Sequence, residues 1–227
     1  MKKFILLTII MLCVNCVSES QQNGLDKVAL LYNATTSYTK GFKTLNGKKN
    51  TYFTIKVSNS KMIDSLNSVT TCPNIALMLF DAFTNKEKKA YTYIHVDLKS
   101  KKDTTSFKYE PKMLETGLEQ VKLFTQFSNN LLNQNYKGMV NQIDPKFIVD
   151  DLEILLKNYF DILITKHGAI KKYTRTGFGS VNLKNGKKLY RFSGYLNFND
   201  GYNRFYFVNV PTQINNKKIQ GYDFLNK

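Results

Sequence analysis

The stretch Lys187–Val210 reads KKLYRFSGYLNFNDGYNRFYFVNV, and it decides the fold class expected for the second half of the chain. In its first run Tyr190, Phe192, Leu196 and Phe198 occupy alternating positions. An apolar period of two predicts a strand with one buried face, and Asp200-Gly201 between two such runs predicts a turn. We therefore expect neighbouring antiparallel strands at about 187–199 and 202–210.

The same pattern extends in both directions from this stretch. Further strands are expected near 170–183 and 214–225, with turns at Asn185-Gly186 and Asn215-Asn216. Before them the apolar period becomes helical, which predicts helices from about Met113 to Gln134 and from about Pro145 to Lys166, the second ended by Gly168.

Two helices followed by a four-strand meander, with Asn135–Val140 (NYKGMV), His167-Gly168 and Lys218–Tyr222 (KIQGY), resemble the nuclear transport factor 2-like, cone-shaped α+β fold. Within that group the likeness is to small uncharacterised domains of bacterial exported proteins. It covers about residues 114–227. The resemblance implies a cone-like domain but no particular activity, because this fold carries enzymes, ligand cups and dimerisation modules.

The first half predicts a separate, smaller α+β domain. Runs at 35–45 and 51–58 flank the turn Asn46-Gly47-Lys48-Lys49, a hairpin signal. A helix is expected from Thr71 or Cys72 as N-cap, with Pro73 in its first turn, through about Thr84. Strands at 91–98 and 104–109 would complete an antiparallel sheet covered by one helix. We place this domain at 28–112 and the cone-like domain at 113–227.

The N-terminus resembles a bacterial lipoprotein signal peptide. Lys2 and Lys3 precede the apolar run Phe4–Leu12, which is too short to cross a bilayer of about 30 Å. We expect residues 1–15 to be a cleaved signal peptide, Cys16 the acylated residue and 16–27 a polar tether without stable contacts. Two alternatives stay open: use of Cys13, and plain secretion without a lipid.

The chain carries a formal charge of +16, from 33 basic and 17 acidic side chains. Lysines are scattered along it, and the only arginines are Arg175, Arg191 and Arg204. Reading of nucleic-acid bases favours arginine forks gathered along one track. We therefore expect no specific nucleic acid as partner, and only weak adhesion to polyanions.

Residues that could carry chemistry are few and isolated. His95 and His167 have no Cys or acidic partner at ligand spacing, and Cys72 is interpreted as a cap or core residue rather than a nucleophile. Asp150, Asp151 and Glu153 are expected to complement a helix dipole. No metal, cofactor or catalytic residue is predicted.

A binding surface is predicted on the second-half sheet. Alternation places Arg191 and Tyr195 on the face opposite the apolar one, and we expect Arg204 and Tyr206 of the next strand on that same side. Arg and Tyr are favoured at binding surfaces, although an ordinary solvated sheet face has the same composition.

Together these features predict a membrane-anchored lipoprotein that acts as a non-enzymatic binding module of the cell envelope. Its partner would be the membrane through the lipid anchor and, beyond that, an envelope protein, a glycan or a small ligand. The alternatives are an exported enzyme with a pocket in the cone-like domain, and a soluble secreted factor.

Overall fold

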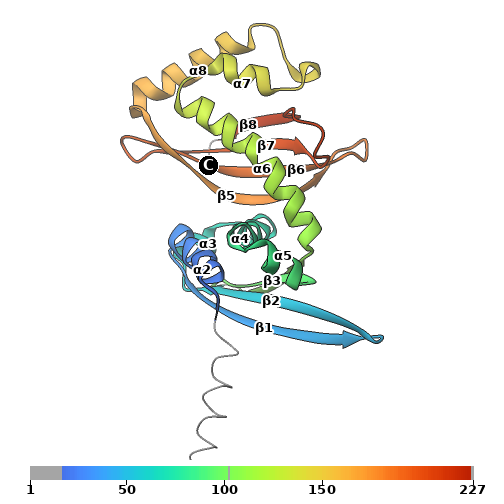
Figure 1. Ribbon diagram of the computed structural model, residues 1–227. Coiled ribbons are helices and arrows are strands. Elements are labelled where there is room, and N and C mark those ends of the chain that lie inside the picture. The colour runs from blue at the N-terminus through green and yellow to red at the C-terminus, as the bar shows by residue number, and fades with distance from the viewer. Residues whose placement is uncertain (1–16, 102, 226–227) are drawn as a thin grey trace, which may run out of the picture.

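The computed structural model describes residues 17–101 and 103–225 (Figure 1). Within them the chain forms seven α-helices and two four-stranded sheets, one mixed and one antiparallel. The expected α+β class is confirmed. The predictions for the signal peptide, Cys13 and Cys16 fall outside the described residues.

The first sheet has the order β1-β2-β3-β4. Its strands are β1 (Thr35–Leu45), β2 (Lys48–Ser58), β3 (Tyr93–Lys99) and β4 (Thr104–Tyr109). The β1–β2 hairpin is confirmed, with a tighter turn than expected: Asn46 and Gly47, at φ 49° and 73°, form it alone. Positive φ at both positions is the requirement of a two-residue hairpin, and Asn-Gly meets it.

The prediction that this sheet is antiparallel and carries one helix is wrong. Strands β2 and β3 are parallel. They are connected by α3 (Lys61–Ser65), α4 (Ser68–Ala82) and α5 (Asn85–Ala90). A connection of this length crosses over the sheet and returns in the same direction, which a short hairpin turn cannot do.

Helix α4 is the centre of the molecule. It packs against α2 (Glu19–Tyr32), against β3 and against β5 (Ile170–Asn182) of the second sheet. It begins earlier than predicted, because Asn67 is the N-cap and accepts a hydrogen bond from the Val69 N–H at 2.9 Å; Pro73 lies inside the helix. Apolar side chains surround α4, as expected of a helix covered on several sides.

The prediction of a tether at 16–27 is also wrong. Helix α2 begins at Glu19, with Ser18 and Gln21 forming a capping box. Its buried face comprises Gln21, Gly24, Leu25, Val28 and Tyr32. Gly24 allows close contact with α4: a Cβ at this position would lie 2.9 Å from Leu79 Cδ1. The polar composition of residues 18–24 does not indicate a helix by itself. The helical spacing of its buried residues becomes recognisable only once α4 packs against α2.

Glu87 fixes the start of α2. The Ser18 hydroxyl donates to one carboxylate oxygen of Glu87, and Ser20 donates to the other at 2.6 Å. Burial alone would raise the pKa of Glu87, but these bonds, with those from Thr84, outweigh it and lower the pKa to about 2. The carboxylate therefore helps to hold the first described residues on the folded body.

We expect Glu87→Gln to destabilise the protein at neutral pH by on the order of 1 kcal/mol, after discounting for solvent screening. A lowered folded-state pKa contributes stability that is present above the unfolded value of 4.5 and is lost as the pH falls toward 2. Urea unfolding at pH 7 and near pH 2 should show the difference from wild type at neutral pH and its disappearance in acid. Glu115→Gln, at an exposed position of helix α6 (Pro111–Leu132), is the control. A pH-independent loss of stability in Glu87→Gln would contradict the assignment.

The second half contains α6 (Pro111–Leu132), α7 (Tyr136–Gln142), the 3-10 turn η1 (Pro145–Phe147), α8 (Leu152–His167) and four strands. The strands β5 (Ile170–Asn182), β6 (Lys188–Phe198), β7 (Asn203–Pro211) and β8 (Gly221–Leu225) form an antiparallel sheet in that order. The predicted meander is confirmed, although β8 is shorter than expected. Helix α7 was not predicted, and α8 starts after Pro145 rather than at it.

One continuous hydrophobic core joins the two halves. Gly117 of α6 lies where α4 and β5 meet, since a Cβ there would be 3.0 Å from Leu77 Cδ1 and from Phe178 Cζ.

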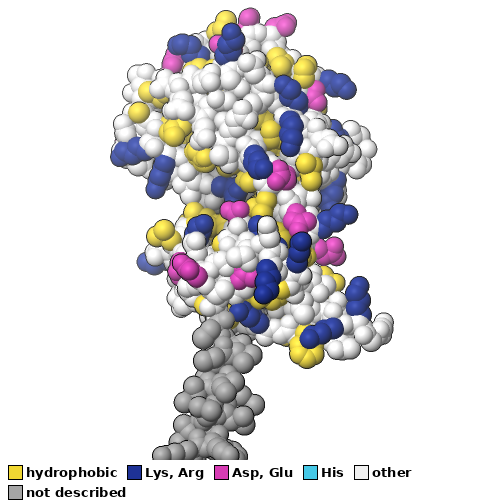
Figure 2. Space-filling view, in the orientation of Figure 1, with side chains coloured by type: hydrophobic (Ala, Val, Ile, Leu, Met, Phe, Trp, Pro, Cys, Tyr) yellow, Lys and Arg dark blue, Asp and Glu magenta, His cyan; other side chains and the backbone are white. Residues whose placement is uncertain are grey.

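The charged side chains on the surface are not gathered in one place. Lys and Arg side chains are spread over both halves of the face in Figure 2, with Asp and Glu among them.

A buried polar junction also connects the halves. The Tyr32 hydroxyl donates to the Thr176 carbonyl at 3.1 Å, and the Asn74 amide donates to the Tyr32 hydroxyl at 2.8 Å. On its other side Asn74 accepts from Arg175 Nε at 2.9 Å. Elements from α2, α4 and β5 are therefore held by one hydrogen-bonded chain.

Candidate functional site

Of the four residues expected to share one face of the second sheet, two do so. Arg191 and Tyr195 are half-buried on one face of β6, whereas Arg204 and Tyr206 of β7 are buried on the other. The correction follows from register: Tyr206 pairs with Gly194, and Arg204 pairs with Leu196. Residues paired directly across an antiparallel ladder share a face, so Arg204 and Tyr206 lie with the apolar side of β6.

Arg204 and Tyr206 have structural partners beneath α6 and α8. The Tyr206 hydroxyl shares a hydrogen bond of 2.6 Å with Ser128, and burial raises its pKa. Arg204 donates to the Phe224 carbonyl at 3.0 Å and lies over the Tyr159 ring. Both side chains therefore stabilise the core and are not part of the candidate site.

Arg191 is held by two neighbours. Its Nε donates to Asn209 Oδ1 at 2.8 Å, and its guanidinium carbon lies 3.9 Å from the centre of the Phe207 ring. Burial lowers the pKa of the guanidinium, which Asp223 opposes. No other hydrogen bond of this group is present among the described residues, so its two terminal nitrogens remain able to donate to a ligand.

These contacts place Arg191 in a cleft of about 210 Å³ between the two halves. The remaining lining side chains are Leu66, Asn67 and Thr70 from the first half, and Thr176, Ser193, Phe205, Phe207 and Leu225 from the second. Aromatic and aliphatic walls surround one cationic group and several hydroxyls, a combination typical of small-ligand sites. We refer to this cavity as the Arg191 cleft.

The sequence did not predict the contribution of the first half. Leu66 and Asn67 directly precede α4, and Thr70 lies in its first turn; all three are far along the chain from Arg191. Only the packing of α4 on β5 brings them there, and a turn-and-cap segment carries no signal of that contact. Phe205 pairs with Tyr195 and Phe207 pairs with Ser193, so the same register places both rings on the face of Arg191.

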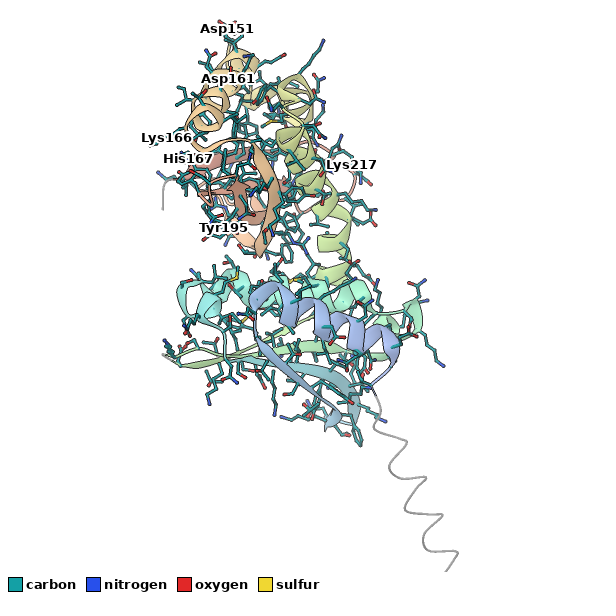
Figure 3. The ribbon with its side chains drawn as sticks, turned by 90° about the vertical axis from the view of Figure 1, so that its left-hand side faces the viewer. Asp151, Asp161, Lys166, His167, Tyr195 and Lys217 are labelled. Atoms are coloured by element: carbon teal, nitrogen blue, oxygen red, sulfur yellow. The ribbon has the colours of Figure 1, made fainter. Side chains whose placement is uncertain are left out.

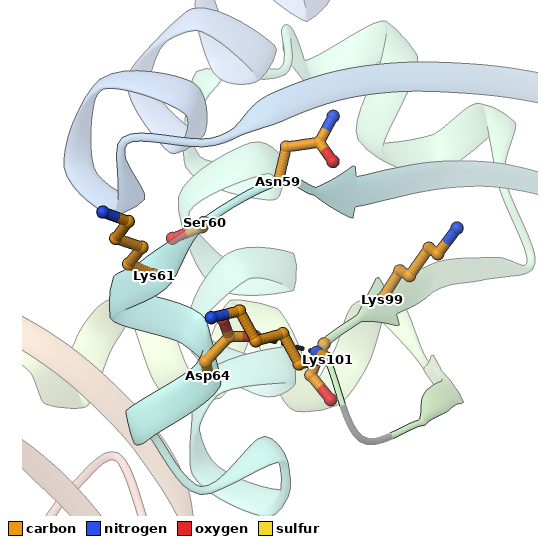
Figure 4. Close-up of a pocket in the computed structure, with 7 residues that line it drawn as sticks. Asn59, Ser60, Lys61, Asp64, Lys99 and Lys101 are labelled. Carbon is orange, nitrogen blue, oxygen red and sulfur yellow. Dashed lines mark hydrogen bonds and ion pairs between the residues drawn. The ribbon is translucent and has the colours of Figure 1, made fainter.

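A second cavity, of about 270 Å³, lies at the carboxyl ends of the parallel strands β2 and β3 (Figure 4). Lys61, Lys99 and Lys101 line it, together with Asn59, Ser60, Ser100 and Asp64. The Lys101 ammonium lies 3.9 Å from the Asp64 carboxylate, and the Lys101 N–H donates to it at 2.8 Å. We call this cavity the lysine pocket. It favours anions, but its lysines are exposed and loosely held.

Cys72 lies in the core. Burial raises the pKa of its thiol to about 12, so it is protonated at neutral pH and unsuited to nucleophilic attack. This agrees with its interpretation as a structural residue.

His95 lies on the open face of the first sheet and stacks on Tyr52, with ring centres 5.3 Å apart. Burial lowers its pKa; Asp97 on the same strand opposes this, and Lys108 and Lys43 add to the lowering. Tyr93, His95 and Asp97 share this half-buried face of β3.

His167 has an acidic partner that the sequence did not predict. Its Nδ1 lies 2.8 Å from Asp200 Oδ2, and its ring stacks on Tyr202 at 3.9 Å. The hydrogen bond with His167 lowers the pKa of Asp200. Asp200 lies in the β6–β7 turn, so the pair joins the end of α8 to the sheet. His167 and Tyr195 lie apart from each other in Figure 3. Neither His95 nor His167 lines the Arg191 cleft or the lysine pocket.

Within residues 17–101 and 103–225 no group of three or more His, Cys, Asp or Glu is placed to hold a metal ion. None of the helices in those ranges combines the length and apolar character needed to traverse a bilayer.

Comparison with known protein families, with curated proteins and with solved structures gives no match. The candidate site therefore rests on its own chemistry.

Proposed function

We propose that this chain is an exported lipoprotein, held to a membrane through Cys16, whose folded body is a non-enzymatic binding module of the cell envelope. The observation that supports binding best is the Arg191 cleft. Its guanidinium is fixed by Asn209 and Phe207 and faces hydroxyl and aromatic groups. None of its lining side chains is an acid, a histidine or a thiol, the groups that general acid–base chemistry uses most.

The ligand proposed for the cleft carries a carboxylate on a small apolar or aromatic body. The carboxylate would accept hydrogen bonds from the terminal nitrogens of Arg191, and the body would lie against Phe205 and Phe207. A cavity of about 210 Å³ is smaller than a drug-sized pocket. It suits a single residue of a protein partner, one glycan unit or a small free ligand.

The position of α2 determines how far the proposed lipid anchor lies from the folded body. Only Val17 and Ser18 separate Cys16 from the first helical residue. A lipid on Cys16 would therefore hold the body directly at the membrane surface. The signal-peptide pattern of residues 1–15 supports the anchor, and plain secretion is the alternative.

At the level of architecture we propose that residues 113–227 form the cone-like domain expected from the order of their elements, and that residues 28–112 form the smaller domain. The antiparallel sheet with α6 and α8 on one face is consistent with this layout. Helix α4 would then belong to the smaller domain and cover the edge of the larger.

Nucleic acid is a poor candidate partner. The basic side chains are dispersed over both halves in Figure 2, and of the three arginines Arg204 is buried and Arg175 bonds to Asn74. We propose weak, salt-sensitive attraction to polyanions, because affinity for phosphates needs basic groups gathered along one track.

An exported enzyme remains the second candidate, and the His167–Asp200 pair is the observation that favours it, since a carboxylate that orients a histidine recurs in catalysis. Loss of a turnover activity in His167→Ala, with the fold intact, would favour this alternative over the binding module.

Two measurements test the proposal. Mass spectrometry of the N-terminal peptide should find acyl chains on Cys16; an unmodified mature N-terminus would exclude the anchor.

For the cleft, phenylacetate serves as the probe and 2-phenylethanol as its uncharged counterpart. Each is titrated into the full chain, and binding is followed by NMR.

We expect Arg191→Ala to weaken phenylacetate binding roughly tenfold, the loss of a charge-assisted hydrogen bond, with a smaller effect on 2-phenylethanol. Lys188→Ala, at an exposed position of the same strand, should leave both unchanged. An equal loss of affinity for both probes in Arg191→Ala, or no binding of phenylacetate by wild type, would contradict the assignment of the cleft.

A further inference from the structure

Helix α8 exposes an unusual amount of apolar surface. Only Leu156 and Phe160 are buried among its sixteen residues, whereas Ile154, Leu155 and Ile162 are 56%, 54% and 69% exposed. A helix that is apolar on all sides is ordinarily covered on all sides, so the outward face of α8 is suited to a partner.

Two of these exposed side chains, Leu155 and Ile162, belong to a stripe along one side of α8, which does not include Ile154. Asp151, Leu155, Asn158, Ile162 and Lys166 follow one another at intervals of four, three, four and four residues. Such spacing places them along one side of a helix, as at the seam of a helix pair. The apolar residues lie in the middle of the stripe, and the charged residues lie at its ends.

The stripe is complementary to itself. Its midpoint lies between Asn158 and Tyr159, so Leu155 and Ile162 are equally distant from it, and Asp151 and Lys166 are also equally distant from it. In an antiparallel, two-fold pair each Leu155 would face Ile162 of the other copy, and each Asp151 would face Lys166. A two-fold interface requires this kind of matching.

The two charged residues are free to pair in this way. Asp151 is the N-cap of α8 at φ 56°, yet its side chain makes no capping hydrogen bond. Neither Asp151 nor Lys166 has an ion pair among the described residues, and the two lie apart along α8 in Figure 3. By contrast Lys157 and Asp161 already pair with each other within the helix.

A membrane fits this face less well than a second copy. Interfacial helices carry mainly Lys and Arg around their apolar face, whereas Asp151, Glu153 and Asp161 accompany the basic residues of α8. In Figure 1, α8 lies at the opposite end of the molecule from the start of α2. We propose that the chain forms a two-fold homodimer through antiparallel packing of the α8 stripe, with the pairing defined above.

Cross-linking of the full chain in non-ionic detergent tests the geometry. Asn158 lies next to the two-fold axis, so Asn158→Cys should be joined to its mate by a short thiol cross-linker. Thr165→Cys is the matched control: it is exposed on the same helix, but its mate would lie about 20 Å away along the helix axis. Wild type measures the background from the native cysteines. Equal cross-linking at both positions, or none at Asn158→Cys, would overturn the proposal.

A charge exchange tests the partner. Sedimentation at several protein concentrations should show Asp151→Lys and Lys166→Asp each weakening the dimer roughly tenfold, because each variant places like charges together twice by symmetry. The double variant should recover most of the loss. Circular dichroism checks that each variant folds.

Recovery in the double variant is expected only if one copy faces another. A monomer at all concentrations, no recovery in the double variant, or association of α8 with phosphatidylglycerol vesicles in place of self-association would each overturn the homodimer.

Discussion

Phe160→Ala is expected to lower the free energy of unfolding by about 3–5 kcal/mol, the usual cost of deleting a buried aromatic ring. Phe160 is fully buried and is one of two buried residues of α8. Its ring meets Phe224 edge-on at 5.0 Å and stacks near Tyr136 at 6.0 Å. Removing it leaves a cavity between α8 and the sheet that rigid neighbours can fill only in part. Urea unfolding followed by circular dichroism measures the loss.

Leu30→Ala provides the matched control. Leu30 is also a large apolar residue on a helix, but it is 85% exposed, so the substitution should change stability by no more than about 0.5 kcal/mol. A small loss in Phe160→Ala, similar to that in Leu30→Ala, would show that α8 does not depend on this ring for its attachment.

Asn74→Ala is expected to lower the free energy of unfolding by about 2–4 kcal/mol, because it removes two hydrogen bonds inside the protein and leaves Arg175 Nε without an acceptor. Asn74 is fully buried and joins the Tyr32 hydroxyl to Arg175 Nε. Burial raises the pKa of Tyr32 and lowers that of Arg175. The loss would fall on the contact between α4 and β5, and with it on the Arg191 cleft.

A double-mutant cycle with Arg175→Met isolates the shared interaction. If the junction acts as one unit, the loss in the double variant should be smaller than the sum of the two single losses by about 0.5–3 kcal/mol. Strict additivity, measured by urea unfolding, would mean that Asn74 and Arg175 act independently and that the junction does not couple the halves.

Local patterns predicted much of the secondary structure. The alternation in Lys187–Val210 predicted β6 and β7, and Asn46-Gly47 predicted the β1–β2 hairpin, because a strand period and a positive-φ turn are properties of a few neighbouring residues. Helix α6 was likewise predicted to within about two residues at each end.

Errors arose where a partner distant in sequence decides the structure. Residues 19–27 look like a tether until α4 packs closely against Gly24, and Glu87 accepts hydrogen bonds from the hydroxyls of Ser18 and Ser20. The parallel pairing of β2 and β3 depends on the whole crossover between them. No window of local sequence contains these contacts.

By itself, the sequence therefore determined the α+β class, most strands and helices, and that Arg191 and Tyr195 share a face. The tertiary structure alone decided the register that buries Arg204 and Tyr206, the docking of α2, and the meeting of Leu66, Asn67 and Thr70 with Arg191 in one cleft. The physical reason is sequence distance. Periodicity and turn conformation are set by neighbouring residues, whereas a cleft between the start of α4 and the second sheet forms only when burial of apolar surface packs these distant segments together.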